Sequence, residues 1–483
     1  MDDAQFFLGA TNKSVLIVDL DGTLIHTDML YETFWSAISA RWLNIIPAMR
    51  ASMNGKAALK RSLEEMGPID IPHLPYNSDV LDYIADWRAK GGQVALVSAS
   101  DQRLVQQVAD HLGLFDAVCG SDGTRNLKGP EKAKYLQDTY GESNFAYMGD
   151  AIADLEVWKY TTKAITVGVS KPLAKRVEAL GIPVERLSDR KRPVKPILKA
   201  MRPHQWLKNV LIFLPMMAAH QFSAITVAQS ILAFVVFSLI ASSVYLLNDL
   251  LDLDADRAHP RKRFRPFASG ELPLVWGTLL TPLLLMTGFG LSLFMGWAFF
   301  GVMALYYAVT TAYSFLLKRE LIVDICALAG LYTLRIIAGG VATGIPLSVW
   351  LLAFSMFFFF SLASMKRQAE LKSGQNMGQE KAHGRSYKTS DLPLIANMAV
   401  SSGYVSVLVM ALYLYSDTVR ALYSFPAPLW GICLVLLFWI SRMTMISHRG
   451  WMHDDPVVFA ARDYISIVCA IIIFVCAIVG TMF

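Results

Sequence analysis

The chain has 483 residues, of which 54% are hydrophobic and 17% are charged, and its formal net charge is +5. This composition is too apolar for a soluble protein of this length, so it excludes an entirely soluble chain and indicates an integral membrane protein. The five cysteines include no C-x-x-C pair, so we expect neither a zinc site nor a disulfide framework. The N-terminus lacks the basic stretch of a signal peptide, so the first domain is expected to remain in the cytoplasm.

Residues 1–185 have the pattern of a soluble α/β domain. Two short apolar runs, 14–18 and 93–97, predict buried strands. The first is followed by Asp19-Leu20-Asp21-Gly22-Thr23 and the second by Ser98-Ala99-Ser100, and further polar sets lie within 126–132 and 145–154. Because open α/β sheets bind ligands beyond the C-terminal ends of their strands, we expect these segments to meet in one site.

Taken in this order, the four segments resemble the four motifs of the haloacid dehalogenase (HAD) superfamily, which implies a Rossmann-like α/β fold. The resemblance implies that Asp19 is the nucleophile that takes the phosphoryl group and that Asp21 is the general acid/base. Ser98 and Lys132 would hold phosphoryl oxygens, with Lys128 as a rival for the second role. A folded but inactive HAD domain is the alternative. The Mg²⁺ ligands that the resemblance implies are Asp19, Asp21, Asp150 and Asp154.

The stretch from about Leu24 to Lys90 has helical periodicity and no strong strand signal. It is therefore predicted to form a helical cap, which would select the substrate and exclude water. A polar, basic segment follows the soluble domain and contains two prolines, which is typical of a linker that ends at a membrane surface. The predicted boundaries are 1–185 for the HAD-like domain, 186–200 for the linker and 201–483 for the membrane domain.

Nine apolar stretches after residue 200 are long enough to cross a bilayer, for which about 20 residues are needed. Lys and Arg residues cluster before the first of them and after the second, fourth, sixth and eighth, with only Arg420 on the opposite side. By the positive-inside rule, the N-terminal domain is then cytoplasmic and the C-terminus lies on the opposite side of the membrane. The expected location is the inner (cytoplasmic) membrane. The predicted spans are 206–222, 226–247, 272–294, 297–317, 321–341, 346–365, 394–416, 427–446 and 463–482.

A cluster of acidic and basic residues follows the second predicted span. Asp249, Asp252 and Asp256 are spaced i, i+3 and i+7, so on one helix they share a face, with Asn248 one turn from Asp252. Carboxylates gathered in this way suit Mg²⁺, which completes its ligand shell with water and substrate phosphates. The alternative without a binding function is a solvated, charged loop between two membrane helices. The basic residues expected to clamp a phosphate are Arg257, Lys262, Arg263 and Arg265.

Two further polar sets lie in or beside predicted spans. Asp324 and Arg335 are eleven residues apart, close to three helical turns, so they share a face, and charges inside a span normally face a polar interior. For Lys366, simple anchoring at the cytoplasmic surface is the alternative. The remaining candidate substrate-binding residues are Arg202, Lys208, Tyr313, Lys318, Arg367, Glu370, Arg385 and Tyr387.

The membrane region resembles the UbiA superfamily of membrane transferases, whose first motif is matched by Asn248-Asp249-x-x-Asp252-x-x-x-Asp256. Segments 202–209, 256–266 and 366–371 resemble in particular the polyprenyl-phosphate phosphoribosyltransferases, which make a precursor of cell-wall arabinan donors. One departure is that Asp324 is followed four residues later by Leu328 rather than by the second aspartate found in many UbiA enzymes. A second metal site is therefore in doubt.

The resemblance implies that the membrane domain transfers 5-phosphoribose from phosphoribosyl pyrophosphate (PRPP) to a polyprenyl (decaprenyl) phosphate, with Mg²⁺ as cofactor. The fused HAD domain would then remove the 5-phosphate from the lipid-linked sugar. Two alternatives remain: transfer of a prenyl group from a prenyl diphosphate to an aromatic acceptor, and a transporter or scaffold with a regulatory phosphatase. The expected partners are PRPP, the lipid phosphate and the bilayer, with no nucleic acid and with a homo-oligomer left open.

Overall fold

The computed structural model describes residues 15–53, 56–122, 125–188, 193–376, 378, 385–416, 419, 423, 425–452 and 455–482. They form two compact units. Unit 1 comprises residues 1–201 together with 245–280, and unit 2 comprises 202–244 together with 281–483. The acidic and basic loop at 248–266 therefore belongs with the N-terminal domain. Part of the predicted linker, residues 189–192, lies outside the described residues. Strand β6 (Val184–Ser188) precedes this part and helix α9 (Val194–Met201) follows it.

A six-stranded parallel sheet organises unit 1, in the order β3-β2-β1-β4-β5-β6. The central strand β1 pairs with β2 and β4, so that Val15 lies opposite both Gln93 and Phe145. Leu16 and Val18 pack into one apolar cluster and Ile17 into another, because both faces of the sheet are covered by helices. The strands are β1 (Val15–Val18), β2 (Gln93–Asp101), β3 (Ala117–Ser121), β4 (Phe145–Gly149), β5 (Lys163–Val167) and β6.

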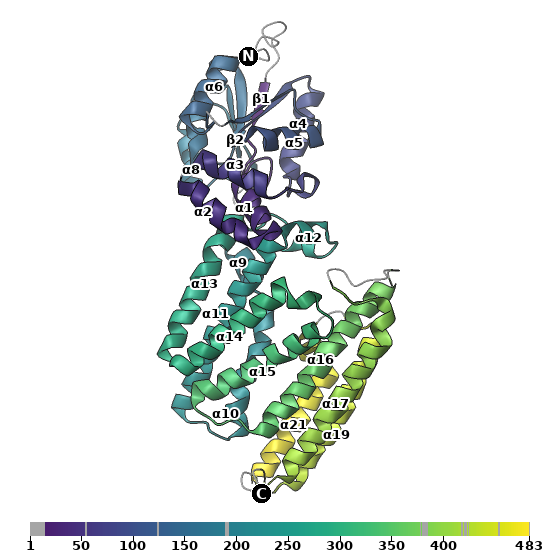
Figure 1. Ribbon diagram of the computed structural model, residues 1–483. Coiled ribbons are helices and arrows are strands. Elements are labelled where there is room, and N and C mark those ends of the chain that lie inside the picture. Colours follow the sequence, from purple (N-terminus) through teal and green to yellow (C-terminus); the bar gives the residue numbers. More distant parts are fainter. Residues whose placement is uncertain are drawn as a thin grey trace. The chain divides into compact units, whose positions relative to one another are not determined.

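Three helices between β1 and β2 form the predicted cap (Figure 1). They are α1 (Met29–Ala40), α2 (Ile45–Met53) and α3 (Lys56–Met66). Asp28 caps the first of them by accepting a hydrogen bond from the Leu30 N–H at 2.8 Å. The α/β fold with a helical insertion is thus confirmed. The helices around the sheet are α4 (Ser78–Ala89), α5 (Gln102–Leu112), α6 (Pro130–Tyr140), α7 (Leu155–Trp158) and α8 (Lys171–Glu178).

Among the described residues, eight helices are long and apolar enough to cross a membrane. The break between the predicted spans 272–294 and 297–317 is present, because α13 ends at Phe294 and α14 begins at Trp297, with Gly296 at φ 101° between them. Large apolar side chains such as Leu434 stay exposed, as expected for a lipid-facing surface. The spanning helices are α11 (Ala224–Leu251), α13 (Leu274–Phe294), α14 (Trp297–Phe315), α15 (Val323–Thr343), α16 (Val349–Asn376), α17 (Leu392–Tyr415), α19 (Trp430–His448) and α21 (Tyr464–Met482).

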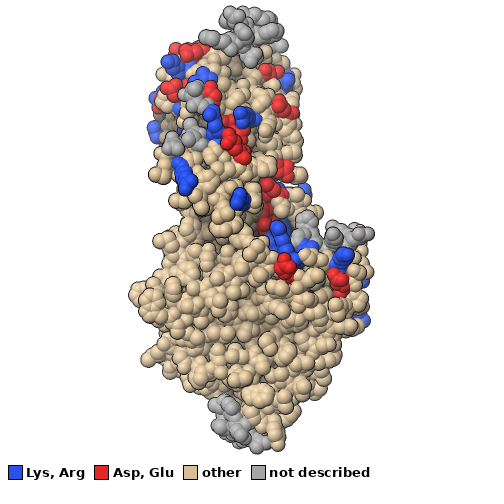
Figure 2. Space-filling model, in the orientation of Figure 1, with Lys and Arg blue, Asp and Glu red and all other residues tan. Residues whose placement is uncertain are grey.

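The first of the nine predicted spans, 206–222, differs in the structure. It is divided into the 3₁₀ segment η5 (Pro203–Phe213) and the short helix α10 (Leu214–Ala218). Pro203 and Pro215 each stand in the first turn of one piece, where the missing N–H costs least, so the two prolines favour two short elements over one continuous helix. Figure 2 shows that uncharged residues cover most of the helical region on the face drawn, as expected of a multi-pass membrane protein.

Candidate active sites

The first site lies at the C-terminal end of β1 in unit 1. Asp19 directly follows the strand, and its Oδ1 accepts a hydrogen bond from the Lys132 Nζ at 2.7 Å. Lys132 also donates to the Tyr147 hydroxyl at 3.0 Å, and that hydroxyl donates to Asp154 Oδ1 at 2.7 Å. All four side chains are buried, so burial and this chain of hydrogen bonds fix Asp19, Lys132 and Asp154 against one another.

Asp19 and two further carboxylates converge at this site. One oxygen each from Asp19, Asp150 and Asp154 lies within 4.8 Å of the others, close enough to share one cation. Asp154 Oδ2 is oriented by the Ala151 N–H at 2.9 Å. A β-carbon on Gly22, which has φ +75°, would lie 2.3 Å from Asp150 Oδ2, so only glycine leaves room for that carboxylate. The donor set, three hard oxygens with a buried excess of negative charge, fits Mg²⁺.

Asp21 is held apart from this cluster. Its Oδ1 accepts from the Met29 N–H at 2.8 Å and its Oδ2 accepts from the Ser100 hydroxyl at 2.6 Å. The predicted role of Asp21 as a metal ligand therefore has no support in the geometry, because both of its oxygens are occupied by donors. Burial, reinforced by the charges of Asp28 and Asp19, raises the pKa of Asp21 to about 7. A carboxyl group that titrates near neutrality suits general acid/base chemistry.

The pKa of Asp19 is raised as well, to about 6. Burial is the largest cause, Lys132 opposes it, and Asp154 adds repulsion. A nucleophilic carboxylate must be ionised at neutral pH, and a bound divalent cation would favour the ionised form. The electrostatics of the site thus agree with the donor set, since both call for an additional positive charge.

A cavity of about 600 Å³ opens over these carboxylates. Lys128 and Ser100 line it, whereas Ser98 is fully buried and its hydroxyl accepts the Ser100 N–H at 3.0 Å. The roles predicted for Ser98 and Lys132 stay predictions, and Ser100 is a candidate that the sequence analysis did not single out. Part of the wall comes from distant sequence within the same unit, namely Pro273, Leu274 and Val275 at the start of α13.

The acidic stripe of unit 1 is not on one unbroken helix. Helix α11 ends at Leu251, Asp252 adopts φ −97° and ψ 16°, and α12 (Leu253–Ala258) follows. Asp249 and Asp256 are both buried, and the Arg265 Nη1 bridges them, at 3.1 Å from Asp249 Oδ1 and 2.5 Å from Asp256 Oδ2. The structure thus brings Asp249 and Asp256 together around one cationic group, whereas Asp252 is half-buried and, among the described residues, forms no three-carboxylate cluster with them.

One oxygen of this cluster supports the metal prediction independently. Asp256 Oδ1 is buried and has no hydrogen-bond partner in the described part of the chain. The Lys262 ammonium, at 3.8 Å, is too far away to satisfy it. Leaving a buried carboxylate oxygen without a partner is costly, so the geometry fits a cation that would bind there.

Arg263, another residue predicted to clamp a phosphate, lies over the Phe264 ring, and its guanidinium carbon is 4.9 Å from the ring centre.

Arg257 has a different partner from the one predicted. Its guanidinium forms a bidentate pair with Glu32 of the cap helix α1, at 2.7 Å and 3.0 Å, and its Nε donates to the Ala268 carbonyl at 3.2 Å. Both side chains of the ion pair are 3% exposed. Arg257 therefore joins the cap to the acidic loop within unit 1, and its donors are not directed at a substrate phosphate.

Replacing Glu32 with alanine should destabilise unit 1 by about 3–5 kcal/mol, because Arg257 would be left buried and unpaired. We expect a clear drop in the unfolding temperature of the purified full-length protein in detergent. The double variant Glu32→Leu with Arg257→Met removes both charges at similar volume and should regain most of the loss. An unchanged unfolding temperature in Glu32→Ala would show that the pair contributes nothing.

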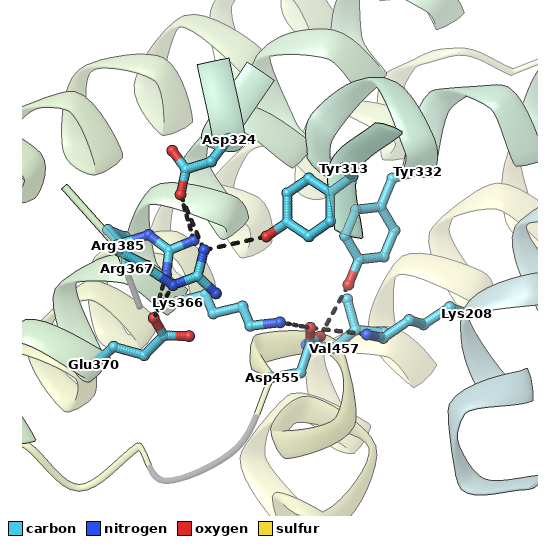
Figure 3. A network of polar contacts seen from close by, with 10 residues as sticks. All are labelled: Lys208, Tyr313, Asp324, Tyr332, Lys366, Arg367, Glu370, Arg385, Asp455 and Val457. Atoms are coloured by element: carbon cyan, nitrogen blue, oxygen red, sulfur yellow. Dashed lines mark hydrogen bonds and ion pairs between the residues drawn. The ribbon is translucent and has the colours of Figure 1, made fainter. Parts of the chain in front are cut away.

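A second group of predicted residues meets in unit 2 (Figure 3). Asp324 is fully buried, forms an ion pair with Arg367 at 2.6 Å, and accepts hydrogen bonds from Arg385 at 3.3 Å and from the Tyr387 hydroxyl at 2.5 Å. Glu370 pairs with the same two arginines, and Arg385 also donates to the Tyr313 hydroxyl at 3.3 Å. Two carboxylates thus face two guanidinium groups. Asp324 is saturated by its partners, which argues against a second metal site there.

Asp324 and Arg335 share a helix face in α15 but do not pair. Arg335 donates instead to Asn209 Oδ1 at 3.0 Å and lies over the Phe237 ring at 4.8 Å. Lys318 lies half-buried in the short segment η7 (Leu317–Arg319), and Arg202 precedes η5 with φ 53°. The predicted contacts of Arg335, Lys318 and Arg202 with a substrate remain predictions.

Asp455 was not predicted from the sequence as a site residue. Its Oδ2 accepts from the Lys208 Nζ at 2.8 Å and from the Lys366 Nζ at 3.2 Å, while its Oδ1 accepts from the Tyr332 hydroxyl at 2.9 Å (Figure 3). Burial alone would raise the pKa of Asp455, but Lys366 and Lys208 outweigh it and hold that pKa well below its usual range. The Asp455-Pro456 pair is a helix-start signal, since Asp455 caps α20 (Pro456–Arg462).

Comparison with known proteins divides the chain in the same way as the motifs. Residues 209–461 match the UbiA prenyltransferase family, and residues 16–159 match haloacid dehalogenase-like hydrolases. The chain is 39% identical to protein y4nM of Sinorhizobium fredii over 459 residues, which cover 94% of this chain and 88% of that protein. It is 38% identical to the nodulation protein NoeC of Azorhizobium caulinodans over 282 residues, covering 58% of this chain and 91% of that one.

Several relatives that are similar to the membrane part are named for an activity. The decaprenyl-phosphate phosphoribosyltransferase of Mycolicibacterium smegmatis is 39% identical over 219 residues, 44% of this chain and 69% of that protein. Among solved structures, a UbiA homolog from Archaeoglobus fulgidus bound to GPP and Mg²⁺ is 15% identical with a TM-score of 0.45, covering 58% of this chain and 99% of that one. A substrate-bound phosphoserine phosphatase is 16% identical with a TM-score of 0.27, covering 39% and 99%.

Proposed function

Because the chain belongs to the UbiA prenyltransferase family and carries a HAD-like hydrolase domain, we propose that it converts a polyprenyl phosphate to polyprenylphosphoryl ribose in two steps. The membrane domain transfers a 5-phosphoribosyl group from PRPP to the lipid phosphate, and the HAD-like domain removes the 5-phosphate. The observation that carries the choice of donor and acceptor is the 39% identity to a decaprenyl-phosphate phosphoribosyltransferase over 219 residues. By analogy with that relative, decaprenyl phosphate is the proposed acceptor.

The proposed donor site is the acidic and basic loop of 248–266. Asp249 and Asp256, which already share one cationic group, would hold Mg²⁺ together with Asp252, and the partnerless Asp256 Oδ1 supports this assignment. Bound Mg²⁺ would neutralise the charge that develops on the departing diphosphate. Lys262, Arg263 and Arg265 are the proposed diphosphate clamp, and Arg265 would turn from the carboxylates to the diphosphate when the site fills.

In the proposed transfer, an oxygen of the lipid phosphate forms a bond to C1 of the ribose while the C1–O bond to the diphosphate breaks. The electron pair of the broken bond leaves with the diphosphate, and configuration at C1 inverts because attack comes from the opposite face. The transition state is oxocarbenium-like, so fixed negative charge beside the sugar stabilises it. No strong general base is needed, because a phosphate dianion is already nucleophilic.

In the second proposed step, Asp19 attacks the phosphorus of the 5-phosphate and the ribose 5-oxygen leaves, taking a proton from Asp21. Water then hydrolyses the aspartyl phosphate, and Asp21 accepts the proton that it lost. The wall formed by Pro273, Leu274 and Val275 supports a membrane-borne substrate, since these residues begin the membrane-spanning helix α13. The distribution of Lys and Arg supports the proposal that both sites face the cytoplasm.

The test uses the purified full-length protein in nanodiscs with ribose-labelled PRPP, polyprenyl phosphate and Mg²⁺, followed by lipid mass spectrometry. We expect label in the lipid fraction and a product that lacks the 5-phosphate. Chelation of Mg²⁺ should abolish incorporation, and added Mg²⁺ should restore it. Label that never enters the lipid would contradict the transferase. Transfer from a labelled prenyl diphosphate to an aromatic acceptor would favour a prenyltransferase, and neither activity would favour a scaffold.

A further inference from the structure

The polar network of unit 2 drawn in Figure 3, taken together with the nearby Arg335, carries more positive than negative charge. Three carboxylates are present, and two of them, Asp324 and Glu370, are matched by two arginines. The third, Asp455, faces both Lys208 and Lys366. Arg335 is buried, and among the described residues no carboxylate oxygen lies within 4.0 Å of it. Five cations against three carboxylates leave a surplus of two positive charges in this network.

This surplus is concentrated around Asp455. The Lys208 ammonium and the Arg335 guanidinium carbon each lie 5.5 Å from the centre of the Tyr332 ring, and the Tyr332 hydroxyl is bonded to Asp455. Lys366 reaches the same carboxylate from α16, whereas its neighbour Arg367 turns to Asp324 (Figure 3). Arg335 is buried, Lys208 is mostly buried and Lys366 is partly exposed, so the surplus positive charge is largely withdrawn from water and favours an anion that carries two negative charges.

A mostly apolar cavity of about 450 Å³ is formed in part by the same elements, although Lys208, Lys366 and Asp455 are not among its lining residues. The segment η5, which carries Lys208, contributes Leu207 and Val210 to its wall, and α20, which Asp455 caps, contributes Val458 and Ala461. An anion site that shares its elements with an apolar cavity matches a ligand with a charged head and a hydrocarbon chain.

We propose that Lys208 and Lys366, held in place by Asp455, bind a phosphate monoester dianion, and that the apolar cavity formed by the same elements identifies this as the phosphate of the polyprenyl acceptor. The assignment rests on the proposed function and adds to it a separate acceptor site with Asp455 as its positioning residue. Asp455 does not contact the phosphate; it occupies one donor of each ammonium group and directs the remaining donors to the ligand. PRPP also carries a phosphate monoester, so the experiment separates the two sources.

The experiment measures KM for polyprenyl phosphate and for PRPP, and binding of polyprenyl phosphate without PRPP, in Lys208→Met and Asp455→Asn. We expect Lys208→Met to raise the KM for the lipid about 10- to 100-fold, since a charge-assisted hydrogen bond is lost. Asp455→Asn should raise it about ten-fold, with a smaller change in kcat.

Asp463→Asn is the control for ion-pair loss elsewhere in unit 2, since Asp463 pairs with Arg442 at 2.6 Å, and its KM values should match the wild type. A rise in the KM for PRPP alone would mean that the site binds a phosphate monoester, but that this is the 5-phosphate of PRPP and not the lipid phosphate. Unchanged KM values and unchanged lipid binding in folded Lys208→Met would overturn the proposal. If the wild-type protein binds no polyprenyl phosphate, the proposed function itself fails, which is a different result from equal binding by wild type and variants.

Discussion

Replacing Asp249 or Asp256 with asparagine should lower ribose incorporation from PRPP by about 10²- to 10³-fold, with the chain still folded. An asparagine keeps the volume but loses the negative charge that a divalent cation requires. Arg265 bridges the two carboxylates and would keep one of them as its partner in either variant, so the loop should retain its conformation. The measurement is label transfer to lipid at saturating PRPP, repeated over a range of Mg²⁺ concentrations.

The Mg²⁺ series identifies the cause of the loss. If the carboxylates bind the metal, a higher Mg²⁺ concentration should recover part of the activity of the single variants and none of the activity of a double variant. Asp254→Asn is the matched control, because Asp254 lies in the same loop but off the stripe, and its exposed side chain should be replaceable without loss. Wild-type activity in Asp249→Asn, or an equal loss in Asp254→Asn, would contradict the metal site.

The parts of the fold that could be predicted from sequence are those that short, local sequence patterns determine. The strand ending at Val18 is apolar and is followed at once by Asp19, so both the strand and the position of the carboxylate were predictable. The contact between Lys132 and Asp19 spans 113 residues, yet it was within reach because the motifs occur in a fixed order. The turn at Met295-Gly296 follows from the length limit on one membrane span.

The parts that escaped prediction depend on tertiary packing between distant segments. Arg257 looked like one of several phosphate ligands, but its partner Glu32 lies 225 residues away, and no local pattern indicates that pair. The regular spacing of the acidic stripe suggested one helix, and the interruption at Asp252 is not visible in that spacing. Asp455 could have been noticed as a helix cap, but its pairing with Lys208 and Lys366 depends on how three separate elements pack.

Replacing Asp19 with asparagine should abolish the proposed dephosphorylation while ribose transfer continues. We expect release of inorganic phosphate from the lipid product to fall by about 10³-fold or more, because the amide cannot attack phosphorus. The lipid fraction should then accumulate the species that still carries the 5-phosphate, heavier than the wild-type product by one phosphoryl group. Lipid mass spectrometry and a phosphate assay on the same reaction would measure both changes.

Asp138→Asn provides the control for this variant, since Asp138 is an exposed carboxylate on α6 in the same domain and should be neutral in both assays. Lys132 keeps its hydrogen bond to Tyr147 when Asp19 becomes asparagine, so the domain is expected to fold. Phosphate release at the wild-type rate in Asp19→Asn would disprove the nucleophile. A wild-type product that retains its 5-phosphate would instead separate the two halves of the proposal, because the transferase would stand while the HAD-like domain would need a different phosphate ester.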